Sequence, residues 1–546
     1  MNGVVLVSKL LIFIPIVNSI FIYILNNKSF NYSVYLTQSA VTLGVAWLWM
    51  SCISEGIINF TLGGWSKQIG IEFKIDNLSL MFMTMAVIIW WVVIIYAWHQ
   101  KKSDFKFLFF LMFLEGCFFG FVQVNDFFTL FVLIEIITII SAILILYKKD
   151  GISLKAGLYY LLFNGFGMMI YLFGITLIYL KVGTLNISLV KVYLMQLDFM
   201  SVDYSVIQVS FVCFLVSMCV KAALFPVYDW LPRAHTSAPS HISALLSGLL
   251  VKTGIYGLIR IMDIYDIDSA YTILFYLGFF TSISGILFAI SQKDIKAILA
   301  FSTISQIGLI IMALGNNSDV GTLAAYMHLF NHFLFKSLLF LGAGIIINEY
   351  GVRRVSEIKG IGRAHPLLTA CMLVGIFSIT GAPLFIGSLS KNMIKLSMTS
   401  ELHLNLYRII SIGTLLYFIK FSRIFFGEPS KKMKINKGQL TGVLLMTMFC
   451  ILTFIAELDI LPSFLSINGV YSNSITDSIH YIEKGIYNNR YILEYLGYMT
   501  IAWILLKLLV NSDSKFWHDL RHFRMKFQDA IVSLLLFFVL LLNYIK

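Results

Sequence analysis

Several ionisable side chains stand inside long apolar runs of this sequence, where a charge is costly. Among them are Glu135, Lys221, Lys252, Lys336 and Lys391. A charge at the centre of a membrane helix costs roughly 2.5–3.5 kcal/mol on insertion scales, and such residues usually mark ion or proton pathways. Each lysine can instead extend to the interface or make a structural ion pair. We favour a proton relay in which Glu135 and Lys221 form a couple, because withdrawing the carboxylate lets a poorly hydrated lysine release its proton.

A second group lies on one face of the apolar run at 321–348. His328, His332 and Lys336 are spaced i, i+4 and i+8, which places all three along one side of a helix. Two histidines at this spacing can bind zinc, but HLFNH lacks the glutamate of H-E-x-x-H, and Lys336 would repel a cation. We therefore predict no metal site and interpret this stripe as a path for protons or water.

Three polar residues near the turn after Lys221 are secondary candidates: Asp229, His235 and His241. The two histidines are equally suited to capping helix ends. GIGRAH at 360–365 lacks the third glycine and the preceding strand of a dinucleotide fingerprint, and no Walker loop, CxxC series or haem-attachment motif occurs. The sequence therefore predicts no redox cofactor, no nucleotide and no redox or hydrolytic site in this chain. Energy must arrive through a partner or an ion gradient.

The elements that carry these residues are predicted to be membrane helices. The chain has 546 residues, of which 59% are hydrophobic and 12% charged, whereas soluble domains are about a quarter charged. About 16 apolar runs are long enough to span a bilayer. They lie at 3–25, 34–54, 77–98, 106–124, 127–147, 156–180, 205–226, 240–262, 270–291, 295–315, 321–348, 367–394, 404–426, 438–456, 492–510 and 527–545. This pattern predicts an all-α polytopic membrane protein.

The basic residues alternate between the two sides of the predicted membrane. Loops after odd-numbered runs carry roughly 22 lysines and arginines, and the other loops about 7, which is a positive-inside pattern. The segments 101–106, 353–363 and 515–526 contribute many of them. We expect these loops in the cytoplasm and both termini on the outer face of the inner (cytoplasmic) membrane. This distribution accounts for the net charge of +12 without a nucleic-acid partner.

Two of the runs contain a proline beside an intramembrane lysine. Pro226 follows Lys221 in run 7, and Pro383 precedes Lys391 in run 12. A proline inside a span opens the helix, and such breaks persist only where protein or water satisfies the freed backbone groups. Because the runs are five apart, they cross in opposite directions, which is typical of inverted repeats with a site near the midplane. We predict helices 1–3 at 1–105, repeats at 106–264 (helices 4–8) and 265–427 (helices 9–13), and helices 14–16 at 428–546.

Several long motifs, in order, resemble those of a known family. After the glutamate of run 5 come KAALFPVYDWLPRAHTSAPSHISALLSGLLVKTGIYGLIR, DIKAILAFSTISQIG, HLFNHFLFKSLLFLGAG and GAPLFIGSLSKNMI. Over about residues 77–427 the chain resembles the antiporter-like membrane subunits. These include the L, M and N chains of respiratory complex I, their counterparts in membrane-bound hydrogenases, and the A and D chains of Mrp antiporters.

The resemblance implies an antiporter-like core of about 14 helices, with two inverted five-helix repeats and broken helices 7 and 12. It also implies that Glu135 and Lys221 form the coupling ion pair and that Lys391 gates exchange at the far half-channel. The water-filled axis between them would consist of Lys252, His328, His332 and Lys336.

Some positions bear on the subtype. Ala382 stands where many members have a second proline, and Ser388 where phenylalanine is common. Lys391 departs from M-type chains, in which a glutamate is usual, and no long amphipathic lateral helix follows run 15, unlike L-type chains. PSHISALLSG and LGGWSKQIGIEFKIDNLSLMFM look more like the D chains of Mrp antiporters and hydrogenase-type chains.

We therefore expect a proton-translocating subunit of a multi-subunit respiratory complex, of the NADH:quinone oxidoreductase or membrane-bound hydrogenase type. Its partners would be other membrane subunits and peripheral redox subunits. The first alternative is a sodium/proton antiporter subunit of Mrp type, which needs the same machinery and would also handle sodium ions. The second is a membrane scaffold that only anchors soluble catalytic subunits, and the retention of every relay position argues against it.

Overall fold

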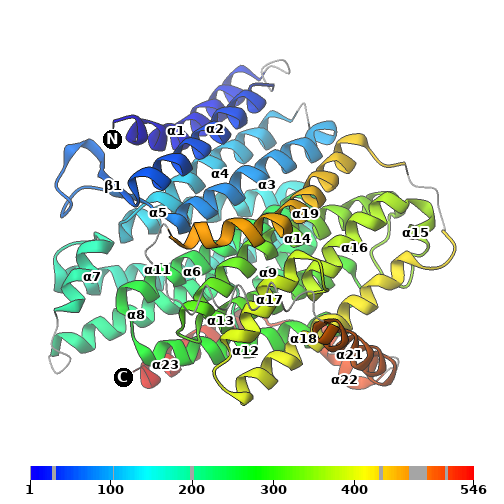
Figure 1. Cartoon of the computed structure of the whole chain (residues 1–546). Helices are drawn as coiled ribbons and strands as arrows, with labels where there is room; N and C mark the ends of the chain where they lie inside the picture. Colours follow the sequence, from blue (N-terminus) through cyan, green and yellow to red (C-terminus); the bar gives the residue numbers. More distant parts are fainter. Residues whose placement is uncertain are drawn as a thin grey trace.

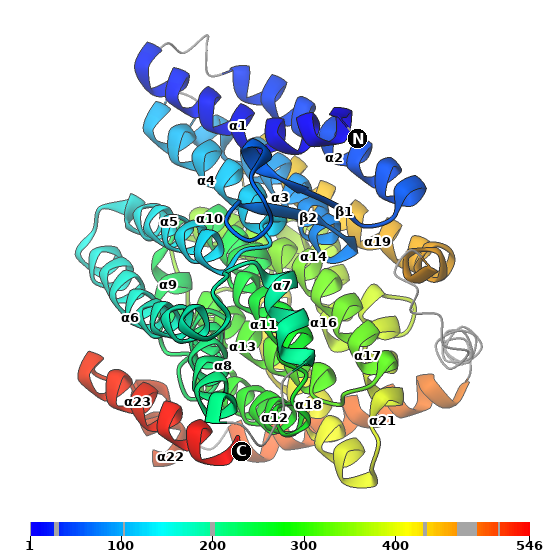
Figure 2. The ribbon, with the colours of Figure 1, turned by 90° about the vertical axis from the view of Figure 1, so that its left-hand side faces the viewer.

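The structure is a computed structural model that describes residues 2–26, 32–101, 104–196, 202–429, 434–466, 489–510 and 514–545. Most of its helices pack side by side in one bundle (Figure 1). The first and last helices lie on opposite sides of this bundle (Figure 2). One side has α1 (Asn2–Leu25) and α2 (Ser33–Glu55), and the other has α21 (Asn489–Leu505), α22 (Lys515–His522) and α23 (Phe527–Tyr544).

Long unbroken helices fill the space between these sides. They are α3 (Asn77–Lys101), α4 (Phe105–Gln123), α5 (Phe127–Ile145), α6 (Gly151–Val182), α12 (Asp268–Ser291), α13 (Ile295–Leu314), α14 (Asp319–Tyr350), α18 (Glu401–Phe421) and α19 (Lys437–Ser466). Short polar residues begin several of them: the Asp126 and Asp150 carboxylates accept hydrogen bonds from first-turn N–H groups of α5 and α6. These bonds satisfy donors that have no partner within the helix.

Two segments are split beside a lysine. α8 (Val202–Lys221) ends at Lys221, and the chain turns through Pro226 before α9 (Trp230–Ser237). α16 (Pro366–Thr380) ends before Pro383, and α17 (Ile386–Ser397) follows. The broken helices 7 and 12 are therefore confirmed. Within the described ranges, 14 helices are long and apolar enough to cross a membrane, and the two interrupted runs account for the difference from the 16 expected.

The eighth membrane segment changes its winding just before Lys252. It consists of α10 (Ser240–Leu245), the π-helical turn η4 (Leu246–Leu250) and α11 (Lys252–Tyr265). A π-helical turn shifts the backbone hydrogen-bond register and occurs frequently at functional sites. Here it leaves carbonyl groups of the turn available to a side chain.

A small hairpin caps one end of the bundle (Figure 1). β1 (Ile58–Thr61) and β2 (Glu72–Ile75) pair antiparallel, joined in part by η2 (Leu62–Gly64). After β2, Asp76 accepts from the Arg260 guanidinium of α11 at 2.5 and 2.8 Å. Burial alone would raise the pKa of Asp76, but Arg260 and Lys74 hold it well below its usual range. This ion pair fixes the start of α3 to the end of α11.

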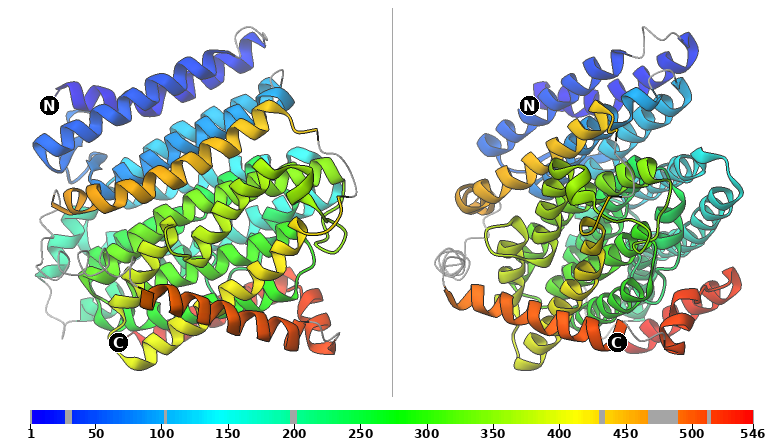
Figure 3. Two further views of the ribbon diagram at one scale, coloured as in Figure 1. Left: turned by 45° about the vertical axis from the view of Figure 1, so that its right-hand side comes forward. Right: turned by 90° about the vertical axis from the view of Figure 1, so that its right-hand side faces the viewer.

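Helices that are distant in sequence complete the packing. α19 lies against α3, α14 and α16 (Figure 3), and α21 packs on α18, α22 on α12 and α23 on α8. The shorter elements are η3 (Leu146–Lys148), α7 (Ile187–Met195), α15 (Ile361–Ala364), η5 (Ser422–Phe425) and η6 (Leu506–Val510). The division into repeats at 106–264 and 265–427 stays a prediction.

Candidate functional site

Glu135 and Lys221 lie close together but form no direct ion pair in the described structure. Lys221, the last residue of α8, donates a hydrogen bond to the Thr138 hydroxyl, one turn after Glu135 on α5. The two charges interact electrostatically, and Glu135 Oε1 has no hydrogen-bond partner. The lysine is therefore held by a neutral group beside its carboxylate, an arrangement from which it can move toward or away from that charge.

Lys252 folds back over the π-helical turn. Its Nζ donates to the carbonyl oxygens of Ser247 at 2.8 Å and Gly248 at 2.6 Å. Two residues on, a Cβ on Gly254 would lie only 2.3 Å from the backbone nitrogen of Ala222. Only a glycine therefore allows α11 to lie directly against the break that follows Lys221. This contact brings the segments of Lys221 and Lys252 together.

Lys336 continues the line on α14. It is fully buried, and its Nζ donates to the Leu299 carbonyl oxygen at 2.8 Å and to the Ser302 hydroxyl. Both acceptors are neutral groups of α13. Because neither acceptor carries a charge, this lysine gains nothing from a fixed opposite charge there, and a proton on it is free to move on.

The helix of Lys336 packs directly on the turn of Lys252. A Cβ on Gly248 would lie 2.4 Å from Ser337 Oγ, so α14 approaches η4 where η4 has no side chain. Lys252 and Lys336, both fully buried, interact electrostatically. Two like charges repel strongly in a medium of low dielectric constant. The pair therefore favours one proton shared between two sites.

The two histidines of α14 connect Lys336 to α17. His332 is buried, neither ring nitrogen has a hydrogen-bond partner among the described residues, and its ring packs edge-on against Phe335. One turn earlier, His328 is hydrogen-bonded through Nδ1 to Ser390 Oγ at 2.9 Å and through Nε2 to Gln306 Oε1 at 3.0 Å. The stripe thus ends beside Ser390, the residue before Lys391.

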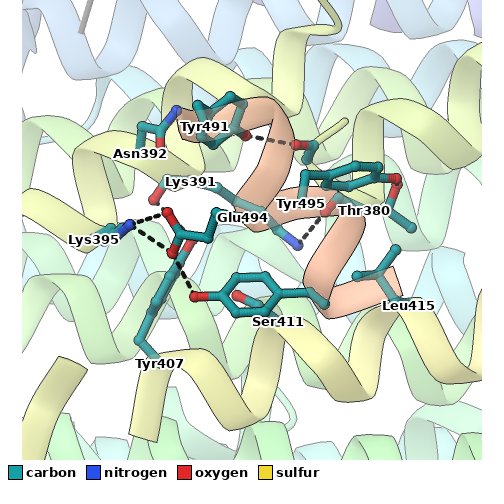
Figure 4. Close-up of a pocket in the computed structure, with 12 residues that line it drawn as sticks. Thr380, Lys391, Asn392, Lys395, Tyr407, Ser411, Leu415, Tyr491, Glu494 and Tyr495 are labelled. Carbon is teal, nitrogen blue, oxygen red and sulfur yellow. Dashed lines mark hydrogen bonds and ion pairs between the residues drawn. The ribbon is translucent and has the colours of Figure 1, made fainter. Parts of the chain in front are cut away.

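Lys391 lies at the other broken helix, beside a small cavity (Figure 4). Its side chain is 3% exposed, and its Nζ donates to the Thr380 carbonyl oxygen at 3.4 Å. Gly381 ends α16 with a φ of +78°, and a Cβ there would meet the Lys391 side chain at 2.8 Å. The cavity offers about 20 Å³, which is enough for a single water.

The secondary candidates fall in different places. His235 is buried against the Phe340 ring at 5.0 Å and interacts electrostatically with Lys336, so it borders the buried line. His241 packs between the rings of Tyr96 and Phe107, toward α3 and α4. The structure does not bring it to the line.

Asp229 is engaged elsewhere. Its carboxylate pairs with Arg233 at 2.5 Å and accepts a hydrogen bond from the Tyr159 hydroxyl at 3.2 Å. Arg233 also donates to the Met525 carbonyl oxygen before α23. This residue therefore belongs to a clamp between α9, α6 and the C-terminal segment, and it lies apart from the buried lysines.

Sequence reasoning missed several of the buried charged residues in the described ranges, among them Lys296, Glu115 and Lys420. Lys296, which counts as a loop residue in the charge pattern, is 2% exposed and donates to the Ala238 carbonyl oxygen at 2.8 Å. Glu115 of α4 is fully buried and faces Gln38 of α2. Its position inside the apolar run LFFLMFLEGCFFGF is the same signal that marks Glu135, and it was present in the sequence.

Together these residues form one line across the bundle, half-buried at Glu135 and buried from Lys221 to Lys391. In order, it contains Glu135, Lys221, Lys252, Lys336, His332, His328 and Lys391. Every member can take up or release a proton. The line can therefore conduct protons between two helix breaks, given water or small side-chain movements between neighbouring groups.

The chain is similar to sequences of known proteins. The family described as NADH:quinone oxidoreductase/Mrp antiporter, transmembrane, matches residues 124–419. The chain is 31% identical over 418 residues to the D chain of an Na(+)/H(+) antiporter of Alkalihalophilus pseudofirmus, a match that covers 74% of this chain and 84% of that protein. It is also 31% identical over 383 residues to a putative antiporter subunit of Staphylococcus aureus, covering 69% of this chain and 76% of that protein.

Two solved structures are similar as well. A chain of the Mrp complex from a Dietzia species superposes with a TM-score of 0.77 at 21% identity, covering 86% of this chain and 98% of that chain. A chain of the membrane-bound sulfane sulfur reductase, an archaeal respiratory membrane complex, superposes with a TM-score of 0.77 at 25% identity, covering 88% and 99%.

Proposed function

The chain belongs to the family of NADH:quinone oxidoreductase and Mrp antiporter membrane subunits, and we propose that it is the proton-translocating subunit of an Mrp-type cation/proton antiporter. It is a multi-pass membrane protein, and the family places it among subunits that translocate cations or protons. The observation that supports the proposal is the series of titratable side chains from the half-buried Glu135 to the buried Lys391. The antiporter type is supported by the identity to an antiporter D chain, along 84% of its length.

In the proposed mechanism, the position of Lys221 sets the proton affinity of the line. Near Glu135 the ammonium is stabilised by the opposite charge, and on Thr138 it is not. Movement toward Thr138 therefore releases a proton toward Lys252, and repulsion between Lys252 and Lys336 passes it on. The histidines carry it to Lys391, from which it would leave on the other side of the membrane.

The partners would be other membrane subunits, because both similar solved chains come from multi-subunit membrane complexes. Sodium ions would be the exchanged cation, as they are in the name of the Alkalihalophilus relative. We place the complex in the cytoplasmic membrane, with the basic loops inside and both termini outside, on the basis of the charge distribution.

A second candidate is the proton-pumping subunit of a respiratory complex. It is favoured by the similarity to a chain of the sulfane sulfur reductase, at 25% identity over 88% of this chain. Peripheral redox subunits would then be additional partners, and electron transfer in them would drive the proton.

The experiment is proton transport by the purified complex in sealed vesicles. For the antiporter, a pulse of sodium ions moves protons across the membrane without any electron donor, and mass spectrometry of the complex finds no iron–sulfur or flavin subunit. Glu135→Gln abolishes the movement, whereas Glu428→Gln, at a surface carboxylate that is 82% exposed, leaves it unchanged. Proton movement that requires a reductant would instead select the respiratory candidate, and unchanged transport in Glu135→Gln would contradict both.

A further inference from the structure

The cavity beside Lys391 is closed by α21, a helix beyond the matched family region. That region ends at residue 419, and α21 begins at Asn489. Its residues that line the cavity are Tyr491, Glu494, Tyr495 and Tyr498. Figure 4 shows the side chains of Tyr491, Glu494 and Tyr495 beside Lys391 in the wall of this cavity.

Two tyrosines hold α21 on the break between α16 and α17. The Tyr491 hydroxyl donates to the Gly381 carbonyl oxygen at 2.7 Å, and the Tyr495 and Thr380 hydroxyls are hydrogen-bonded at 3.0 Å. The Thr380 carbonyl oxygen is also the acceptor for Lys391 Nζ. The position of α21 is therefore tied to the same backbone that holds the lysine.

Glu494 lines this cavity and is partly exposed. Its carboxylate accepts from Lys395 at 2.7 and 2.6 Å and from the Tyr498 hydroxyl at 2.5 Å. Lys395 is one turn after Lys391 on α17, so both lysines point to the same side of that helix. The side chains of Lys395 and Glu494 are 27% and 26% exposed, whereas Lys391 is buried. The three charges thus lead outward from Lys391.

In the second predicted repeat, neither α13 nor α17 carries a carboxylate. In the predicted repeat, α13 corresponds to α5, the helix of Glu135, yet residues 295–314 contain neither aspartate nor glutamate. Among the described residues that line the cavity, Glu494 is the one acid. A lysine that passes protons on needs a proton acceptor, and Glu494 of α21 is the carboxylate beside this lysine.

We propose that Glu494 is the carboxylate that exchanges protons with Lys391 and opens this half-channel to the surface. Through one water in the cavity, an N–H bond of Lys391 breaks and an O–H bond forms on Glu494. The neutral carboxylic acid then leaves Lys395, gives its proton to bulk water and pairs with Lys395 again. This inference rests on the proposed function, because protons must reach Lys391 along the buried line.

The charged and titratable surroundings favour an ionised Glu494 at rest. Lys391 is faced by His328 of α14, by Tyr407 of α18 and by Lys395 on its own helix. The residues of α21 that face Lys391 are Tyr491, Glu494, Tyr495 and Tyr498. Glu494 is faced by Lys395, Tyr498 and Arg408 of α18. Cations thus outnumber acids around this carboxylate, which is what a proton acceptor that must reset requires.

Two neutral substitutions separate this role from a structural clamp. The readout is the midpoint pH, at which an amine reagent has labelled half of the Lys391 side chains in the purified complex, as measured by mass spectrometry. Glu494→Gln removes the negative charge and leaves Lys395, so the midpoint pH for Lys391 falls by about one unit. Lys395→Gln leaves Glu494 unopposed, and the midpoint pH rises. Glu428→Gln, at the distant surface pair, is the matched control and causes no shift.

Transport is measured on the same preparations. Glu494→Gln lowers proton movement about tenfold, which is less than the roughly 100- to 10,000-fold loss for an acid–base group without a substitute, because water in the cavity partly replaces the carboxylate. Shifts of equal sign in the two variants, no shift, or unchanged transport in Glu494→Gln would each overturn the proposal and leave a clamp. If Glu494→Gln fails to assemble, the Lys395→Gln/Glu494→Gln double variant leaves no unpaired charge, and the expected result is the same tenfold loss of proton movement; unchanged transport in it would overturn the proposal. If the unaltered complex moves no protons, the proposed function fails, while the opposite shifts still report whether Glu494 acts on Lys391.

Discussion

The two broken helices place their lysines in contrasting surroundings. Lys221 ends α8 deep in the bundle, with Glu135 of the same predicted repeat beside it and a hydroxyl as its acceptor. Lys391 lies in α17 beside a cavity, and the carboxylate that lines this cavity comes from α21. One device, a lysine at a helix break, therefore serves a closed site in one half and a site near the surface in the other.

The backbones around the two breaks are also held differently. At the first break another helix packs directly on the backbone, since Gly254 of α11 lies against Ala222. The second is closed by its own halves, since a Cβ on Gly387 of α17 would lie 1.7 Å from the Ser378 carbonyl oxygen of α16. Movement at the first break must therefore involve α11, which carries Lys252, whereas the second break is a rigid corner.

The largest expected effect comes from removing each lysine in turn. Lys221→Ala lowers proton transport about 100-fold or more, because no other base lies between Glu135 and Lys252 on the described line and proton-transfer groups contribute about 100- to 10,000-fold. Lys391→Ala lowers it only about tenfold, because water and Glu494 remain in the cavity. Vesicle transport measures both. Equal losses would show that the second site is as closed as the first.

The next effect is on stability. Gly254→Ala lowers the free energy of unfolding by about 1–3 kcal/mol through overpacking, and Gly387→Ala lowers it by more than about 3 kcal/mol because its contact is closer and within one corner. Thermal unfolding of the complex in detergent measures both. Gly165→Ala is the control, since nothing lies within 4 Å of a Cβ there, and it causes no loss of stability, because alanine is favoured over glycine inside a helix by about 1 kcal/mol. A larger loss for Gly254→Ala would reverse the assignment of the rigid break.

The sequence predicts the two helix breaks and their lysines, but it does not predict the groups that surround each lysine. The breaks and the stripe of α14 were predictable because run length, proline position and helical spacing are local signals. Thr138 as the acceptor of Lys221 and Glu494 as the carboxylate near Lys391 were not predicted, because each depends on which distant helices pack together. Spacing likewise puts His328 and His332 on one stripe but does not give them different neighbours.

The smallest effect concerns the group that separates Lys221 from Glu135. Thr138→Val keeps the shape of the side chain and removes the hydroxyl that accepts from Lys221. The lysine then loses its neutral acceptor and stays beside Glu135. There the lysine retains its proton, because the carboxylate stabilises the ammonium group. A hydrogen bond of about 1 kcal/mol corresponds to a roughly fivefold slower transport. Thr138→Ser keeps the hydroxyl and transports normally. Equal slowing in both variants would mean that packing, and not the hydroxyl, holds the lysine away from its carboxylate. The first site would then have no neutral resting position for its lysine, and this difference from the second site would disappear.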